Sequence, residues 1–199
     1  MPSTIFLLRH AAHDRVGSIL CGRMPGVTLG ATGHRQAAAL AGRMAGEAIS
    51  ALYASPMERA RETAAPMAER LGLAPRPCEG MTEIDFGDWT GRSFGSLEGD
   101  ASWARWNTAR ATSRVPGGES MAEAQERAVA AVEQLHANHP EGRVAIVSHA
   151  DIIKAVLAHY LRLSLDDLFR FDIAPASVSA LALWEGGGKV LSMNETVAA

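Results

Sequence analysis

The sequence has little of what marks several special classes of protein. Its 199 residues include two cysteines, Cys21 and Cys78, and neither belongs to a Cys-x-x-Cys pair. A disulfide framework and a thiolate zinc site are therefore both disfavoured. We expect two free thiols.

The chain also lacks an excess of one charge and any long hydrophobic run. A formal net charge of -3 and a pI near 6.2 argue against nucleic acid or an anionic membrane as a partner. No stretch approaches the roughly 18 to 20 apolar residues of a membrane span, and no basic segment precedes a signal-peptide core. These absences predict a cytoplasmic protein whose partner is a small molecule.

Apolar residues are abundant, at 47% of the chain, which is enough for one sizeable core. We expect a single domain over residues 1–199. Three short apolar runs end just before polar clusters and are typical of buried parallel strands. They occupy residues 4–8 (TIFLL), 48–54 (AISALYA) and 143–148 (RVAIVS).

Helical patterns alternate with these runs, which predicts an α/β fold with a mostly parallel sheet. The predicted helices span residues 32–47, 56–72, 120–139 and about 151–161. Ser120 and Glu123 form a capping-box pattern at the start of the third helix. Pro66 predicts a break or kink in the second.

Two further segments depart from this alternation. The apolar stretches at 177–185 and 189–195 flank EGGGK and predict an antiparallel hairpin at the sheet edge. Residues 92–115 show weaker periodicity and contain Trp103 and Trp106. We interpret them as a small insertion that covers a site.

Polar side chains that can bind phosphate follow the predicted strands. Arg9 and His10 follow the first strand, and Ser148 and His149 follow the last. In parallel α/β sheets, ligands bind beyond the carboxyl ends of the strands, so these residues should converge. Arginine forks match phosphate oxygens, and neutral imidazole is a good nucleophile. Arg9 should help to keep His10 unprotonated.

The histidines of the IFLLRHAAHD segment at 5–14 have two other interpretations, a metal site and a purely structural role. His10 and His13 have a spacing that suits metal binding on a helix, but the pattern places them in a loop without a further ligand cluster. A metal site is therefore not expected. Alternatively, a histidine after a strand is often merely structural or solvated.

Five segments in order resemble the histidine phosphatase superfamily, which includes the cofactor-dependent phosphoglycerate mutases. They are LLRHA at 7–11, SPMERARETA at 55–64, EIDFGDWTG at 83–91, PGGES at 116–120 and SHADIIK at 148–154. The resemblance covers nearly the whole chain. It implies a phosphoglycerate mutase-like three-layer α/β/α sandwich that needs no metal or dissociable cofactor.

The resemblance also implies roles for individual residues. His10 corresponds to the nucleophile that becomes a phosphohistidine, and Glu83 stands where the family keeps its proton donor, with Asp85 as the alternative. Arg9, Arg59 and His149 occupy positions that bind the phosphoryl group.

The first loop departs from the usual family pattern. Ala11 replaces a common glycine, His13 a frequent threonine, and Val16 an asparagine that often holds phosphate. His13 stays a candidate phosphate contact. Arg23, or backbone amides of the CGRMPG segment at 21–26, are expected to compensate for Val16.

The predicted function is hydrolysis of a small phosphorylated metabolite through a phosphohistidine. The first alternative is a phosphoglycerate mutase-type phosphotransferase, although the insertion at 92–115 is short for a mutase. The second is a phosphate-binding module without turnover. The sequence names no substrate, and it leaves monomer and homodimer open.

Overall fold

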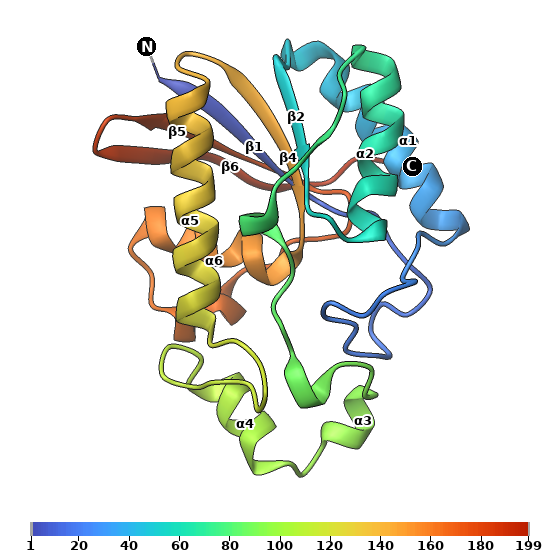
Figure 1. The fold of residues 1–199 in the computed structure, drawn as a ribbon, viewed down its shortest axis with the longest axis vertical. Helices are drawn as coiled ribbons and strands as arrows, with labels where there is room; N and C mark the ends of the chain where they lie inside the picture. Colours follow the sequence, from blue (N-terminus) through green and yellow to red (C-terminus); the bar gives the residue numbers. More distant parts are fainter. Residues whose placement is uncertain (1, 199) are drawn as a thin grey trace.

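The computed structural model describes residues 2–198, which form a six-stranded mixed sheet in the order β3-β2-β4-β1-β5-β6 (Figure 1). The strands are β1 (Ser3–Arg9), β2 (Ala51–Ala54), β3 (Arg76–Pro77), β4 (Arg143–Ser148), β5 (Val178–Trp184) and β6 (Gly187–Glu195). β1, β4, β2 and β3 run parallel, whereas β5 and β6 are antiparallel additions. The predicted mostly parallel sheet with a terminal hairpin is confirmed.

Helices cover both faces of the sheet and complete the predicted three layers (Figure 1). The helices α1 (Ala31–Met44) and α2 (Glu58–Leu71) lie on one face, and α5 (Met121–Asn138) and α6 (Ala150–Leu161) on the other. None of the helices described within residues 2–198 combines the length and hydrophobicity that a membrane span requires.

The central strand β1 shows why its apolar run is continuous. Ile5 and Leu7 belong to the hydrophobic cluster under α5 and α6, whereas Phe6 and Leu8 belong to the cluster under α1 and α2. Successive side chains of a strand point to opposite faces, so a strand covered on both faces is apolar at every position.

One local helix signal acts as predicted and another does not. Ser120 and Glu123 form the expected capping box of α5. The break expected at Pro66 does not occur, because α2 continues through it from Glu58 to Leu71. Proline removes one hydrogen bond of the helix, and the buried side chains Thr63 and Met67 on either side of it keep the helix against the core.

Most element boundaries lie one to three residues from the predicted ones, and two of these shifts concern β2 and the final hairpin. β2 begins at Ala51 rather than at residue 48, because Ala48 adopts a left-handed conformation with φ 48°. The hairpin turn consists of Glu185 and Gly186 alone, and β6 already begins at Gly187. Gly188 is required in the strand, since a Cβ there would lie 2.7 Å from Cδ1 of Tyr160.

The insertion contains the helices α3 (Phe94–Leu97) and α4 (Ala101–Thr108). Its Trp106 is fully buried and packs against Phe86 and Trp89 of the preceding segment. Short 3-10 helices at Ala45–Glu47, Glu79–Met81, Gly87–Trp89 and Leu165–Arg170 complete the described fold.

Candidate active site

The carboxyl ends of three neighbouring strands bring the predicted residues together. The His10 amide donates to the carbonyl of Ser148 over 2.9 Å, and the Ser55 amide donates to the carbonyl of Val147 over 2.8 Å. These bonds join the chain just after β1, β2 and β4. Residues 10, 55 and 149 therefore meet at one edge of the sheet, as the topology predicts.

The His10 ring is oriented by its own loop. Its Nδ1 lies 2.8 Å from the carbonyl oxygen of Ala11. Because a carbonyl only accepts, Nδ1 carries the proton and Nε2 presents a lone pair. Burial, together with the charges of Arg59 and Arg9, holds the pKa of His10 well below its usual range. His10 is consequently neutral at neutral pH.

Arg59 links the two histidines. Its guanidinium is 1% exposed, with Nε 3.4 Å from His10 Nε2 and Nη2 3.2 Å from His149 Nδ1. The Nη2 also donates to the carbonyl of Gly22. His149 Nε2 in turn lies 2.8 Å from Ser55 Oγ. Since Arg59 only donates, Nδ1 of His149 accepts and its Nε2 carries the proton.

Three buried nitrogens in this cluster have no hydrogen-bond partner among the residues described. They are Arg9 Nε, Arg59 Nη1 and His13 Nδ1. Arg9 is held from the other side, because its Nη1 donates to the carbonyl of Ile173 over 2.6 Å. Unsatisfied buried donors on two arginines are a strong signal for an absent anion.

Glu83 supplies a carboxyl group beside these cations. Its Oε2 lies 3.9 Å from Arg59 Nη2 and 3.5 Å from His149 Nδ1, while its Oε1 accepts from the amide of Ile84. Burial raises the pKa of Glu83 to about 7, although the positive charge of Arg59 opposes the shift. At neutral pH this carboxyl group can give or take a proton.

A cavity of about 160 Å³ opens over these groups. Arg9, His10, Arg59 and Glu83 line its polar end. Its other wall is largely apolar and consists of Val16, Ile19, Leu20, Phe86 and Phe94. The volume suits a phosphoryl group with part of its leaving group, and Phe94 comes from the insertion predicted to cover the site.

His13 lies in this cavity, whereas Arg23 does not. The His13 ring stacks on that of His10 at 5.5 Å, and burial lowers its pKa to about 4. Arg23 turns away from the cavity, because its Nε donates to the carbonyl of Glu83 and its Nη2 to Glu119. Arg23 is thus not among the residues that line the cavity, and the predicted phosphate contact by Arg23 stays a prediction. Neighbouring carbonyl and carboxylate acceptors hold this guanidinium instead.

The sequence interpretation missed several residues that shape the site. Thr63 accepts from the amide of Ala11, which keeps that residue out of the left-handed region and makes its methyl group acceptable. Asp151 lines the cavity and pairs with Arg110 of the insertion over 3.0 Å. Asp151 lies inside the SHADIIK segment, two residues after His149. This position in the sequence could have identified Asp151 as a residue of the site.

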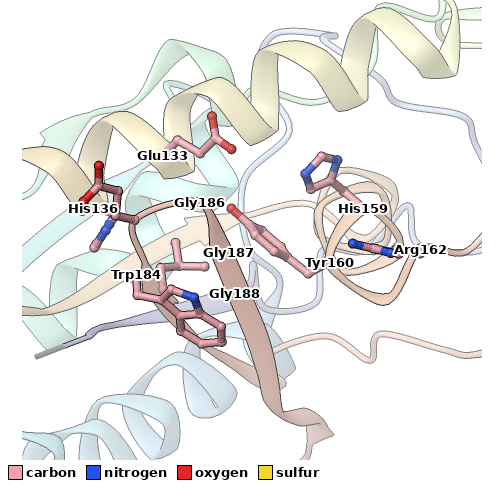
Figure 2. Close-up of a pocket in the computed structure, with 11 residues that line it drawn as sticks. Glu133, His136, His159, Tyr160, Arg162, Trp184, Gly186, Gly187 and Gly188 are labelled. Carbon is pink, nitrogen blue, oxygen red and sulfur yellow. The ribbon is translucent and has the colours of Figure 1, made fainter.

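A larger cavity, of about 720 Å³, lies elsewhere on the molecule (Figure 2). Glu133 and His136 of α5, Tyr160 of α6 and the β5–β6 turn line it, and it contains none of the predicted site residues. In residues 2–198 no group of three or more His, Cys, Asp or Glu side chains is arranged to hold a metal ion.

Comparisons with known proteins identify a matching family and several similar phosphatases. The family model of the histidine phosphatase superfamily (branch 1) matches residues 5–196. A glucosyl-3-phosphoglycerate phosphatase of Mycobacterium tuberculosis is 32% identical over 170 residues, which cover 80% of this chain and 75% of that protein. Phosphoserine phosphatase 1 of Hydrogenobacter thermophilus is 27% identical, with 96% and 92% covered.

A solved structure extends the likeness to three dimensions. The native structure of the mycobacterial glucosyl-3-phosphoglycerate phosphatase superimposes with a TM-score of 0.89 at 27% identity. The match covers 98% of this chain and 100% of that one. Insertion, sheet and hairpin therefore all fall within the matched fold.

Proposed function

The chain belongs to branch 1 of the histidine phosphatase superfamily, and from that premise we propose a metal-independent phosphomonoester hydrolase that acts through a phosphohistidine. Relatives named for hydrolysis of glucosyl-3-phosphoglycerate and of phosphoserine support a small phosphorylated metabolite as substrate. One observation carries the mechanism: a neutral His10 with its Nε2 lone pair lies in a cationic cavity beside a carboxyl group whose pKa is about 7.

In the first step, His10 Nε2 attacks phosphorus and the bond to the leaving oxygen breaks. Protonated Glu83 transfers its proton to that oxygen, so the product leaves as an alcohol. Arg9 and Arg59 bind the equatorial oxygens with the donors for which residues 2–198 provide no partner. We assign further phosphate contacts to His149 and His13, whose protonation a bound dianion favours.

In the second step, ionised Glu83 accepts a proton from water while the water oxygen attacks phosphorus. The N–P bond breaks, and its electron pair returns to His10 Nε2. Inorganic phosphate leaves and Glu83 is again protonated, so the cycle closes without a metal or a redox partner. The short insertion at 92–115 favours water over a second sugar hydroxyl as acceptor, which argues for hydrolysis over mutase activity.

The test compares wild type with His10→Ala in EDTA, on an aryl phosphate and on a panel of sugar, amino-acid and phosphoglycerate esters. We expect phosphate release in EDTA that the variant loses. Rapid quenching of wild type should trap a phosphoenzyme with the acid lability of phosphohistidine. A cytoplasmic location and a monomeric or homodimeric state stay predictions, which cell fractionation and light scattering can check.

Other outcomes decide between the alternatives. Transfer between 3- and 2-phosphoglycerate that outpaces hydrolysis would establish a mutase. Tight binding of inorganic phosphate without turnover of any ester would establish a binding module.

A further inference from the structure

Glu119, in the PGGES segment, lies at the centre of a half-buried ionic network next to the site. Its Oε2 accepts from Arg23 Nη2 at 2.9 Å, from Arg127 Nη2 at 3.0 Å and from the Asp85 amide at 3.0 Å. Its Oε1 accepts from Arg127 Nε at 2.7 Å. The carboxylate is thus held between two arginines and one amide.

Further donors of the two arginines bind main-chain carbonyls at Glu83 and just before it. Arg23 Nε donates to the carbonyl of Glu83 over 2.8 Å, and Arg127 Nη2 reaches the same oxygen at 3.2 Å. Arg127 Nη1 donates to the carbonyls of Gly80 and Thr82, over 2.8 and 2.7 Å. Four carbonyl contacts and the Asp85 amide therefore fix the segment that carries Glu83.

Backbone packing brings the two segments into direct contact. The Glu119 amide donates to the carbonyl of Asp85, and the Asp88 amide donates to that of Pro116. A Cβ at Gly118 would lie 2.2 Å from the Asp85 oxygen, and one at Gly87 would lie 2.3 Å from that of Pro116. Glycine is therefore required where the two segments meet.

From this network we infer that Glu119, acting with Arg23 and Arg127, is a positioning residue for the proton donor Glu83. The inference rests on the proposed function. The network contacts neither His10 nor Arg59 directly, so it controls where the acid lies relative to the leaving oxygen and leaves the nucleophile in place. A displacement of about 1 Å in a reacting group can lower a rate by about 10²-fold.

The charge of Glu119 is essential to the arrangement. Every one of its partners is a hydrogen-bond donor, and a carboxylate has acceptors on both oxygens. Glutamine would direct an NH2 group at one of the arginines. At least one guanidinium would then turn away and release its carbonyl oxygen on the Glu83 segment.

The experiment measures kcat and KM of Glu119→Gln on two substrates, an alkyl phosphate and an aryl phosphate with an acidic phenol as leaving group. The alkyl ester needs a proton donor because an alkoxide is a poor leaving group. The aryl ester does not, because an acidic phenol leaves readily as the phenolate. We expect kcat/KM, which reports the first step, to fall roughly ten- to hundredfold on the alkyl ester and less than about threefold on the aryl ester. The value of kcat also includes the second step, in which Glu83 acts on the same phosphoenzyme for both substrates. Adding Glu119→Gln to Glu83→Gln should cause little further loss on the alkyl ester, because Glu83→Gln has already removed the proton transfer that Glu119 positions.

Glu123→Gln is the matched control. It makes the same chemical change four residues away, in an exposed carboxylate that pairs with Arg114 and accepts from the Ser120 amide, a capping contact that glutamine can also make. It should leave the ratio of the two rates unchanged. If Glu119→Gln folds poorly, Arg23→Gln, at the more exposed end of the network, should produce the same selective loss.

The outcomes separate this inference from the function beneath it. Equal losses on both substrates, or fully additive losses in the double variant, would overturn the positioning role while hydrolysis through Glu83 stands. If Glu83→Gln itself lowers kcat/KM equally on both substrates, the assignment of Glu83 as the acid fails first.

Discussion

Glu83 combines burial with a position between a guanidinium and an imidazole. Its pKa of about 7 places the change of protonation within the working range of pH, while the pKa of His10 lies well below 6.5. At pH 7 the carboxyl group is therefore about half protonated, so it can serve as acid and then as base, while the imidazole is neutral and can attack.

This difference predicts an asymmetric pH profile. Attack requires protonated Glu83, so kcat/KM for an alkyl phosphate should fall as pH rises above about 7 and ionises the carboxyl group. Glu83→Gln should lose about 10²- to 10⁴-fold on the alkyl ester, and its residual activity should lack the alkaline limb. Steady-state kinetics from pH 5 to 9 checks this. An unchanged alkaline limb in the variant would assign the titration to another group.

The same shift predicts an effect on stability. Between pH 4.5 and 7 the unfolded chain ionises Glu83 while the folded protein keeps the proton, so the free energy of unfolding falls as pH rises. The lost stability is on the order of 3 kcal/mol at pH 8. Relative to wild type, Glu83→Gln should therefore gain stability from pH 5 to 8 in urea titrations. A difference independent of pH would contradict the raised pKa.

Among the helices, α1 holds the loop that follows His10. Gly33 packs on that loop, since a Cβ there would lie 1.9 Å from the carbonyl oxygen of Ala12. The side chain of Gln36 accepts from the Ala12 amide over 2.9 Å. Helix and loop are therefore too close for any side chain at position 33.

Two glycines of α1 provide a matched pair of variants. Gly33→Ala should lower the free energy of unfolding by about 1 to 3 kcal/mol. It should also lower kcat/KM, because the added methyl group would clash with the main chain of the loop that follows His10. A Cβ at position 42 would have no neighbouring atom within 4 Å, so Gly42→Ala should stabilise the protein by up to about 1 kcal/mol and leave its activity unchanged. Thermal unfolding and phosphatase assays measure both. Equal stability of the two variants would show that the close approach at Gly33 is absent.

The whole molecule has one hydrophobic cluster that joins the insertion to the central sheet. Trp106 and Leu97 of the insertion belong to the same cluster as Ile5 of β1 and Val132 of α5. We therefore propose that residues 1–199 unfold as a single domain. Tryptophan fluorescence, which reports largely on the insertion, should give the same urea midpoint as far-UV circular dichroism. An earlier fluorescence transition would reveal an insertion that unfolds by itself.

Local signals in the sequence were sufficient for most of the fold. The apolar run of β4 matches its strand from residue 143 to 148, and the capping box marks the start of α5. The strand order follows no local pattern, and neither does the continuity of α2 through Pro66. Both depend on packing between segments distant along the chain.

For the site, the sequence contained the identities of the chemical groups, because His10, Arg59, Glu83 and His149 each lie in a segment typical of the family. The sequence alone did not determine where each side chain points in the folded protein. Arg23 was expected at the phosphate, but in the structure it donates to the carbonyl of Glu83 and to the carboxylate of Glu119, since a long side chain binds the acceptors that the fold brings within its reach. The tautomers, the raised pKa of Glu83 and the arginine network arise from contacts between residues far apart in the chain. Those contacts exist only once the sheet and its loops have come together.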